Sequence, residues 1–165
     1  ISYLLTPATV CLAVPLYEQL ELLKKNMVAV VCGILSGTLA SLGGIFALCT
    51  LFGFNHQQYV TMLPKSITTA IGIGISEELG GIVTITVAVI IITGILGNVI
   101  ADTVFHIFKI KNPLAKGLAL GTASHAIGTA RAIEMGPVEG AMSSLAVAVA
   151  GLLTVIFVSG FAQLI

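Results

Sequence analysis

The sequence predicts an all-α polytopic integral membrane protein, with transmembrane helices and two broken or re-entrant half-helix elements that form an inverted repeat. The first observation is composition, since 57% of the 165 residues are hydrophobic and only 8% are charged. Soluble domains carry about 25% charged residues. The second is charge spacing, which leaves neutral runs at residues 26–64, 79–101 and 140–165. Each run is long enough for the roughly 20 residues with which a helix crosses a bilayer.

The third observation is a weak internal repeat. Moving the sequence by 56 positions places residues 68–81 on residues 124–137, and five of the fourteen positions then agree. The identical pairs are Ala70 with Ala126, Ile71 with Ile127, Gly72 with Gly128, Glu78 with Glu134, and Gly80 with Gly136. We interpret residues 63–81 and 119–137 as two copies of one membrane-embedded element that face each other around a site.

The N-terminal segment, residues 1–16, is expected to be a helix or the second half of one. Thr6 and Pro7 are a candidate backbone break, because proline removes a donor and a hydroxyl can bond the freed carbonyl. The chain starts at Ile1, and we expect upstream helices to be missing. We interpret residues 1–165 as a single membrane domain. Residues 17–26 are polar and predict an interfacial connection.

The first full span is predicted at residues 27–52. Gly33, Gly37 and Ser41 recur every four residues there. Small residues at this spacing form a smooth stripe on which another membrane helix can pack closely. The stripe is therefore interpreted as architecture rather than chemistry.

The first repeat element follows a predicted polar loop at residues 53–62. Pro64 is expected to open a helix, because proline is favoured in a first turn. That helix is expected to break at residues 77–81, before a second span at residues 82–107.

The second repeat element follows the lysine-containing connection at residues 108–116. The element itself is predicted at residues 117–133, and the last span at residues 137–165. Pro137 and Glu139 favour a helix start there, since a carboxylate in the first turn faces the positive end of the helix dipole.

The lysines favour re-entrant elements. By the positive-inside rule Lys24 and Lys25 are cytoplasmic, so the following span leads outward. If residues 63–81 return to the face they entered, the next span runs inward and the lysines of residues 108–116 are also cytoplasmic. If residues 63–81 cross fully, those lysines lie outside. The re-entrant arrangement also makes the second element enter from the opposite side, which inverts the repeat.

Hydroxyl side chains open both predicted half-helices. A half-helix N-terminus presents unpaired N–H groups and partial positive charge, which suits a small anion. The hydroxyls are Ser66, Thr68 and Thr69 in one element and Thr122 and Ser124 in the other. They are candidates for binding such an anion, and helix capping is the equally weighted alternative.

Three further residues of the second element are candidate binding groups. His125 and Thr129 are four residues apart and share a helix face. Arg131 could hold a carboxylate with two hydrogen bonds, or it could form a structural ion pair with Glu134 or Glu78. His125 could carry a proton near neutral pH, or it could be a packed, hydrogen-bonded side chain.

Glu78 and Glu134 end the two half-helices at equivalent positions. A carboxylate there opposes the helix dipole, so we expect it to serve proton or ion coupling. Lys65 and Asp102 are interpreted as interfacial charges. The candidate backbone breaks in the elements are the paired glycines Gly72, Gly80, Gly128 and Gly136.

Several activities are not expected. The sequence has no G-x-x-x-x-G-K-[ST] phosphate loop, no G-x-S-x-G nucleophile elbow and no metal-ligand spacing. We therefore predict that the protein is not an enzyme and uses neither cofactor nor metal. Its net charge of zero makes nucleic acid an unexpected partner.

The chain also carries an ordered series of motifs. They are Thr6-Pro-Ala-Thr-Val10, Ala13-Val-Pro-Leu-Tyr17, Leu63-Pro-Lys-Ser66, Ser76-Glu-Glu-Leu-Gly-Gly81, Ser124-His-Ala-Ile-Gly-Thr-Ala130 and Glu139-Gly-Ala141. Together they resemble the LrgB/CidB family of bacterial antiholin-like membrane proteins, a domain similar to that of the plastidal glycolate/glycerate translocator. The resemblance covers essentially the whole chain, without the family's N-terminal portion.

The resemblance implies two functions. One is transport of small monocarboxylates such as glycolate, glycerate or pyruvate by a secondary transporter or facilitator, which the paired elements favour. The alternative is a non-transporting regulator of murein hydrolase export and autolysis, acting with a small holin-like LrgA/CidA-type membrane protein. Either function places the chain in the lipid bilayer of the bacterial cytoplasmic membrane, and the small-residue stripe is compatible with a homo-oligomer.

Overall fold

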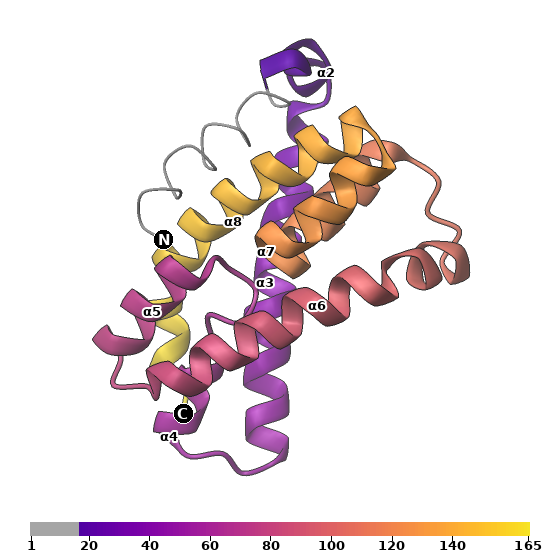
Figure 1. The fold of residues 1–165 in the computed structure, drawn as a ribbon. Helices are drawn as coiled ribbons and strands as arrows, with labels where there is room; N and C mark the ends of the chain where they lie inside the picture. The colour runs from indigo at the N-terminus through magenta and orange to yellow at the C-terminus, as the bar shows by residue number, and fades with distance from the viewer. Residues whose placement is uncertain (1–16) are drawn as a thin grey trace, which may run out of the picture.

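The computed structural model describes residues 17–165, so the predicted break at Thr6 and Pro7 lies outside the described residues. Within that range the chain forms seven helices and no strand, as the sequence predicts (Figure 1). The helices are α2 (Leu20–Lys25), α3 (Met27–Leu51), α4 (His56–Met62), α5 (Thr69–Glu78), α6 (Val83–Ile107), α7 (Pro113–Met135) and α8 (Pro137–Ala162).

Three helices are long and apolar enough to cross a membrane. They are α3, α6 and α8, with 25, 25 and 26 residues. They match the predicted spans at residues 27–52, 82–107 and 137–165 to within three residues. Much of α6 is exposed, and its outer face carries large apolar side chains such as Ile92, Leu96 and Val99. Such a face fits a lipid environment, and the chain is a helical membrane protein.

The segment before α5 differs from the prediction. Residues 53–62 were expected to be a loop, which is wrong, because α4 occupies most of them. Asn55 Oδ1 accepts from the Gln58 N–H at 2.9 Å, and Gln58 Oε1 accepts from the Asn55 N–H at 3.0 Å. This capping box starts the helix. Pro64 does not open a helix either, since it follows α4 and the N-cap of α5 is Thr68.

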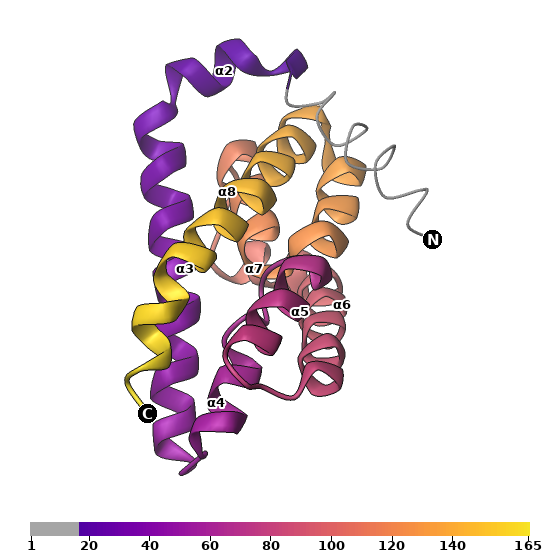
Figure 2. The ribbon, with the colours of Figure 1, turned by 90° about the vertical axis from the view of Figure 1, so that its left-hand side faces the viewer.

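Helix α7 folds back on itself at His125. The φ and ψ angles of His125 are 43° and −142°, which no α-helix accommodates. They divide α7 into a first arm, residues 113–124, and a second arm, residues 126–135. Both arms run alongside the first half of α8 (Figure 2).

The contacts of α7 with α8 give the direction of each arm. A Cβ on Gly117 would meet the backbone of Glu139, and one on Gly121 would meet the backbone of Ser143, so the first arm runs parallel to α8. In the second arm, Thr129 hydrogen-bonds Ser143 at 2.9 Å, while Ile133 packs on Gly140. The second arm is therefore antiparallel to α8.

Two of the predicted backbone breaks are wrong. Gly72 and Gly128 lie inside helical segments of α5 and α7. Because they have no side chain, these glycines permit close approach of neighbouring backbone instead. A Cβ added to Gly72 would lie 3.7 Å from the Pro64 carbonyl oxygen, and one added to Gly128 would lie 2.6 Å from the Leu120 carbonyl oxygen. The other two glycines lie between helices, Gly80 with a φ of 74° after α5 and Gly136 at the junction of α7 and α8.

Several contacts recur at the 56-residue spacing of the repeat. Gly72 lies close to the Pro64 carbonyl oxygen, and at the equivalent positions 56 residues later Gly128 lies close to the Leu120 carbonyl oxygen. Likewise, Thr86 Oγ1 donates to the Thr61 carbonyl oxygen at 3.0 Å, and the equivalent residues 117 and 142 are in contact. In Figure 1, α6 passes from left to right and its sequence counterpart α8 from right to left.

The packing of α7 on α8 predicts a steric effect at Gly121. In a Gly121→Ala variant the new Cβ would lie 2.8 Å from the Ala146 Cβ and would also press on the Ser143 carbonyl. Overpacking of this kind costs about 1–3 kcal/mol, so Tm of the purified protein in detergent should fall by roughly 3–10 °C.

The matched control is Gly43→Ala on α3, where a Cβ meets nothing within 4 Å. Its Tm should equal or slightly exceed that of the wild type, because alanine favours a helix. Equal Tm values for the two variants would contradict the packing described for α7.

Candidate functional site

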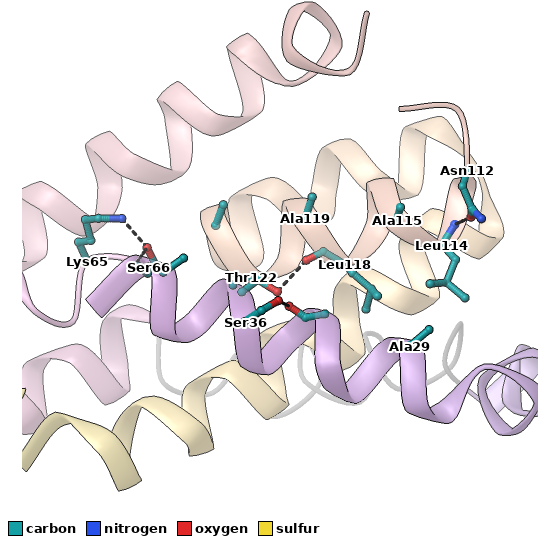
Figure 3. Close-up of a pocket in the computed structure, with 15 residues that line it drawn as sticks. Ala29, Ser36, Lys65, Ser66, Asn112, Leu114, Ala115, Leu118, Ala119 and Thr122 are labelled. Carbon is teal, nitrogen blue, oxygen red and sulfur yellow. Dashed lines mark hydrogen bonds between the residues drawn. The ribbon is translucent and has the colours of Figure 1, made fainter. Parts of the chain in front are cut away.

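A pocket of about 890 Å³ lies between α3 and the first arm of α7 (Figure 3). Its walls are mainly small apolar residues, such as Ala40 on α3 and Ala115 and Ala119 on α7. The polar lining residues are Ser36, Ser41, Lys65, Ser66, Asn112 and Thr122. No acidic side chain lines the pocket within the described part of the chain.

The small-residue stripe on α3 positions this pocket. A Cβ on Gly33 would lie 3.4 Å from Leu118 Cδ1, and one on Gly37 would lie 2.7 Å from Thr122 Cγ2. These glycines let the first arm of α7 approach α3, which confirms the stripe as a helix-packing surface. The stripe also lines the pocket, so packing and site share the same residues.

Lys65 is the charged residue of the pocket. Its Nζ donates to Ser66 Oγ at 2.7 Å, and Ser66 Oγ lies 3.0 Å from Ser41 Oγ. Figure 3 shows Lys65 and Ser66 at one end of the pocket and Asn112 at the other. An ammonium group and two hydroxyls in an apolar pocket can bind a small anion through charge-assisted hydrogen bonds.

The sequence suggests an interfacial charge at Lys65, whereas the structure places Lys65 in the lining of this pocket. The sequence does contain a signal for this site, because Lys65 is the only charged residue between Asn26 and Ser76. An ionisable side chain within a long apolar region indicates a functional site.

Ser66 and Thr122 place both repeat elements at the pocket. They are 56 residues apart and therefore occupy equivalent positions in the repeat. Both are buried. Thr122 Oγ1 donates to the Leu118 carbonyl at 2.7 Å, which leaves its oxygen free to accept.

Other predicted binding residues lie outside the pocket lining. Thr68 and Thr69 begin α5. Ser124 is buried against Gly97, where α6 has no room for a Cβ. His125 and Thr129 take part in the hydrogen bonds that hold the second arm of α7.

Arg131 is held by carboxylates of its own chain. It forms ion pairs with Asp102 at the end of α6 and with Glu134 at 2.7 Å. An ion pair with Glu134 or Glu78 was the alternative to carboxylate binding that the sequence suggested for Arg131, and the structure has the pair with Glu134. The sequence did not predict the ion pair with Asp102. Glu78, the equivalent of Glu134, is exposed at the end of α5.

The comparisons with known proteins identify the family. A sequence model of the LrgB-like family matches residues 1–164. The chain belongs to this family. It is 42% identical over 161 residues to the antiholin-like protein LrgB of Bacillus cereus (strain B4264) and, equally, to that of Bacillus anthracis (strain A0248). Each alignment covers 98% of this chain and 70% of the relative. No solved structure matches the chain.

In this LrgB-like chain, His125 combines a strained backbone with two hydrogen bonds. Its φ of 43° with ψ of −142° is a conformation normally left to glycine. His125 Nε2 lies 2.9 Å from the Ile90 carbonyl oxygen, and the His125 carbonyl accepts from Thr129 Oγ1 at 3.1 Å. These contacts hold the fold-back of α7 against α6.

Backbone strain at His125 predicts that glycine is a better replacement than alanine. Both substitutions remove the bond to Ile90, but only His125→Gly relieves the unfavourable φ. Its Tm should therefore exceed that of His125→Ala by about 2–4 °C, which corresponds to about 1 kcal/mol.

The control is Ala130→Gly in the second arm of α7, an exposed helical position. Here glycine should lower Tm, because it costs about 1 kcal/mol in a helix relative to alanine. If glycine were the worse residue at both positions, the strained fold-back at His125 would be refuted.

Proposed function

We propose that this LrgB-like protein is a secondary transporter or facilitator of small monocarboxylates such as glycolate, glycerate or pyruvate. The observation that carries the proposal is Lys65, which donates a hydrogen bond to Ser66 in a pocket that no acidic side chain of residues 17–165 lines. A lysine surrounded by apolar walls is costly unless it is paired. A carboxylate would supply the missing negative charge.

The pocket fits the chemistry of such a substrate. Lys65 Nζ has three donor hydrogens, and within residues 17–165 one of them is used, in the bond to Ser66 Oγ. The carboxylate would bind to Lys65 and to the hydroxyls beside it, while the alanine walls would contact a short carbon chain. In this arrangement Lys65 takes the carboxylate-binding role that the sequence suggests for Arg131, whose charge is already paired.

The second support is the relation between the two repeat elements. We interpret residues 63–81 and 119–137 as re-entrant, inverted repeats, whose equivalent residues Ser66 and Thr122 line the same pocket. The first arm of α7 has 12 residues, about 18 Å of helix, which is too short to cross roughly 30 Å of hydrocarbon. Inverted broken elements around a central site are typical of secondary transporters with alternating access.

Glu78 and Glu134 fit a coupling role in the same proposal. They end equivalent helical segments and are exposed, so a proton or cation could reach both. The ion pair between Glu134 and Arg131 would then form and break as the charge of Glu134 is neutralised. Ser124, His125 and Thr129 would maintain the fold-back of α7 around the substrate.

A second candidate function follows from the name of the Bacillus relatives. An antiholin-like role would make the chain a regulator of murein hydrolase export and autolysis, working with a small holin-like membrane protein. The bacterial cytoplasmic membrane is the expected location for both functions. Transport and lysis control are compatible if the effects on autolysis lie downstream of carboxylate transport.

The test is uptake of labelled glycolate and pyruvate into proteoliposomes that contain the full-length protein. Lys65→Gln should lower the initial rate at least tenfold, since it removes the charge that binds the carboxylate. Lys111→Gln, a charge loss at an exposed position, should keep most of the activity. Uptake by Lys65→Gln at the wild-type rate would refute the site. No uptake by any folded variant, with or without a pH gradient, would favour the regulator.

A further inference from the structure

A second, much smaller cavity lies beside the pocket and shares Ser41, Ser66 and Thr122 with it. Its volume of about 10 Å³ suits one water-sized molecule. Five hydroxyl-bearing residues from four segments line it, together with apolar side chains. They are Thr38, Ser41, Ser66, Thr122 and Thr154.

Thr38 Oγ1 is buried at this cavity without a hydrogen-bond partner. The residue is 3% exposed, and its oxygen is the one buried side-chain polar atom left unpaired among residues 17–165. A buried hydroxyl that makes no bond costs free energy that most proteins avoid. A molecule in the cavity would satisfy it.

The neighbouring hydroxyls define what that molecule must do. Thr122 Oγ1 donates to the Leu118 carbonyl oxygen and Thr154 Oγ1 donates to the Ala150 carbonyl oxygen, each at 2.7 Å. Because the proton of each hydroxyl is used in these bonds, both oxygens can only accept a further hydrogen bond. Thr38 still has a proton to donate. The occupant therefore has to accept one bond and donate others, which a water molecule does.

Charge argues against a cation in the same place. Lys65 Nζ lies 2.7 Å from Ser66 Oγ, which lines the cavity, and the described part of the chain contributes no acidic side chain to the lining. A second positive charge would be repelled in these apolar surroundings. A neutral occupant has no such penalty.

We infer that a single water molecule fills this cavity, accepting a hydrogen bond from Thr38 Oγ1 and donating its two protons to Thr122 Oγ1 and Thr154 Oγ1. The water links α3 to α8 and to the first arm of α7, beside Ser66. It is a fixed polar link at the centre of the repeat and does not depend on whether the pocket transports carboxylates.

The test is thermal unfolding of full-length Thr38→Val and Thr38→Ser variants in detergent. With water bound, Thr38→Val removes one of its partners and should lower Tm by about 2–4 °C, whereas Thr38→Ser keeps the hydroxyl and should stay within about 1 °C of the wild type. The control is Thr50→Val, an exposed site on the same helix whose hydroxyl bonds the Phe46 carbonyl.

A Tm for Thr38→Val at or above the wild-type value would overturn the proposal, because deleting an unpaired hydroxyl costs nothing. A structure at better than 2 Å should show one density peak within hydrogen-bond distance of Thr38 Oγ1, and an empty cavity would refute the water. The same Tm series in sodium and choline chloride at equal ionic strength should agree. A stabilisation specific to sodium and lost in Thr38→Val would identify a cation and also overturn the proposal.

Discussion

The close contact of glycines with neighbouring helix backbones is the constraint on which this fold depends. In a membrane, burial of apolar surface does not drive helices together, so packing and hydrogen bonds must do so. Gly117 and Gly121 bring α7 onto the backbone of α8, while Gly33 and Gly37 bring it onto α3. Without these contacts, neither the fold-back at His125 nor the pocket beside it would be held in place.

The sequence predicts the long elements well, because they depend on the length of neutral runs. All three spans and the stripe of Gly33, Gly37 and Ser41 follow from pattern alone. Helix α4 was missed because its capping box sits in a stretch whose polarity suggested a loop. The break in α7 was expected at a glycine, Gly128, but it lies at His125, whose unfavourable backbone is maintained by contacts with α6 that no local pattern reveals.

The candidate site was harder to predict than the fold, since it depends on distant residues. Arg131 is paired with Asp102, which is 29 residues earlier in the chain, and spacing rules do not reach that far. Lys65 meets Ser41 and the first arm of α7 only through tertiary packing. Three buried threonines, by contrast, follow one rule: Thr122, Thr129 and Thr154 each donate to the carbonyl four residues earlier. Each of these hydroxyl groups therefore makes its donor hydrogen bond within its own helix, and its oxygen can still accept another hydrogen bond.

The order of the helices along the chain also has a consequence for biosynthesis. Each arm of α7 is shorter than the roughly 20 residues that insert as an independent membrane helix. Its most extensive partner, α8, is the next helix to be translated. When α7 leaves the ribosome, α3 and α6 have been made, but the face of α8 on which both arms pack has not. The packing of α7 can thus be completed only after α8 has been made, and a ribosome that stops within α8 would leave this part of the chain incompletely packed.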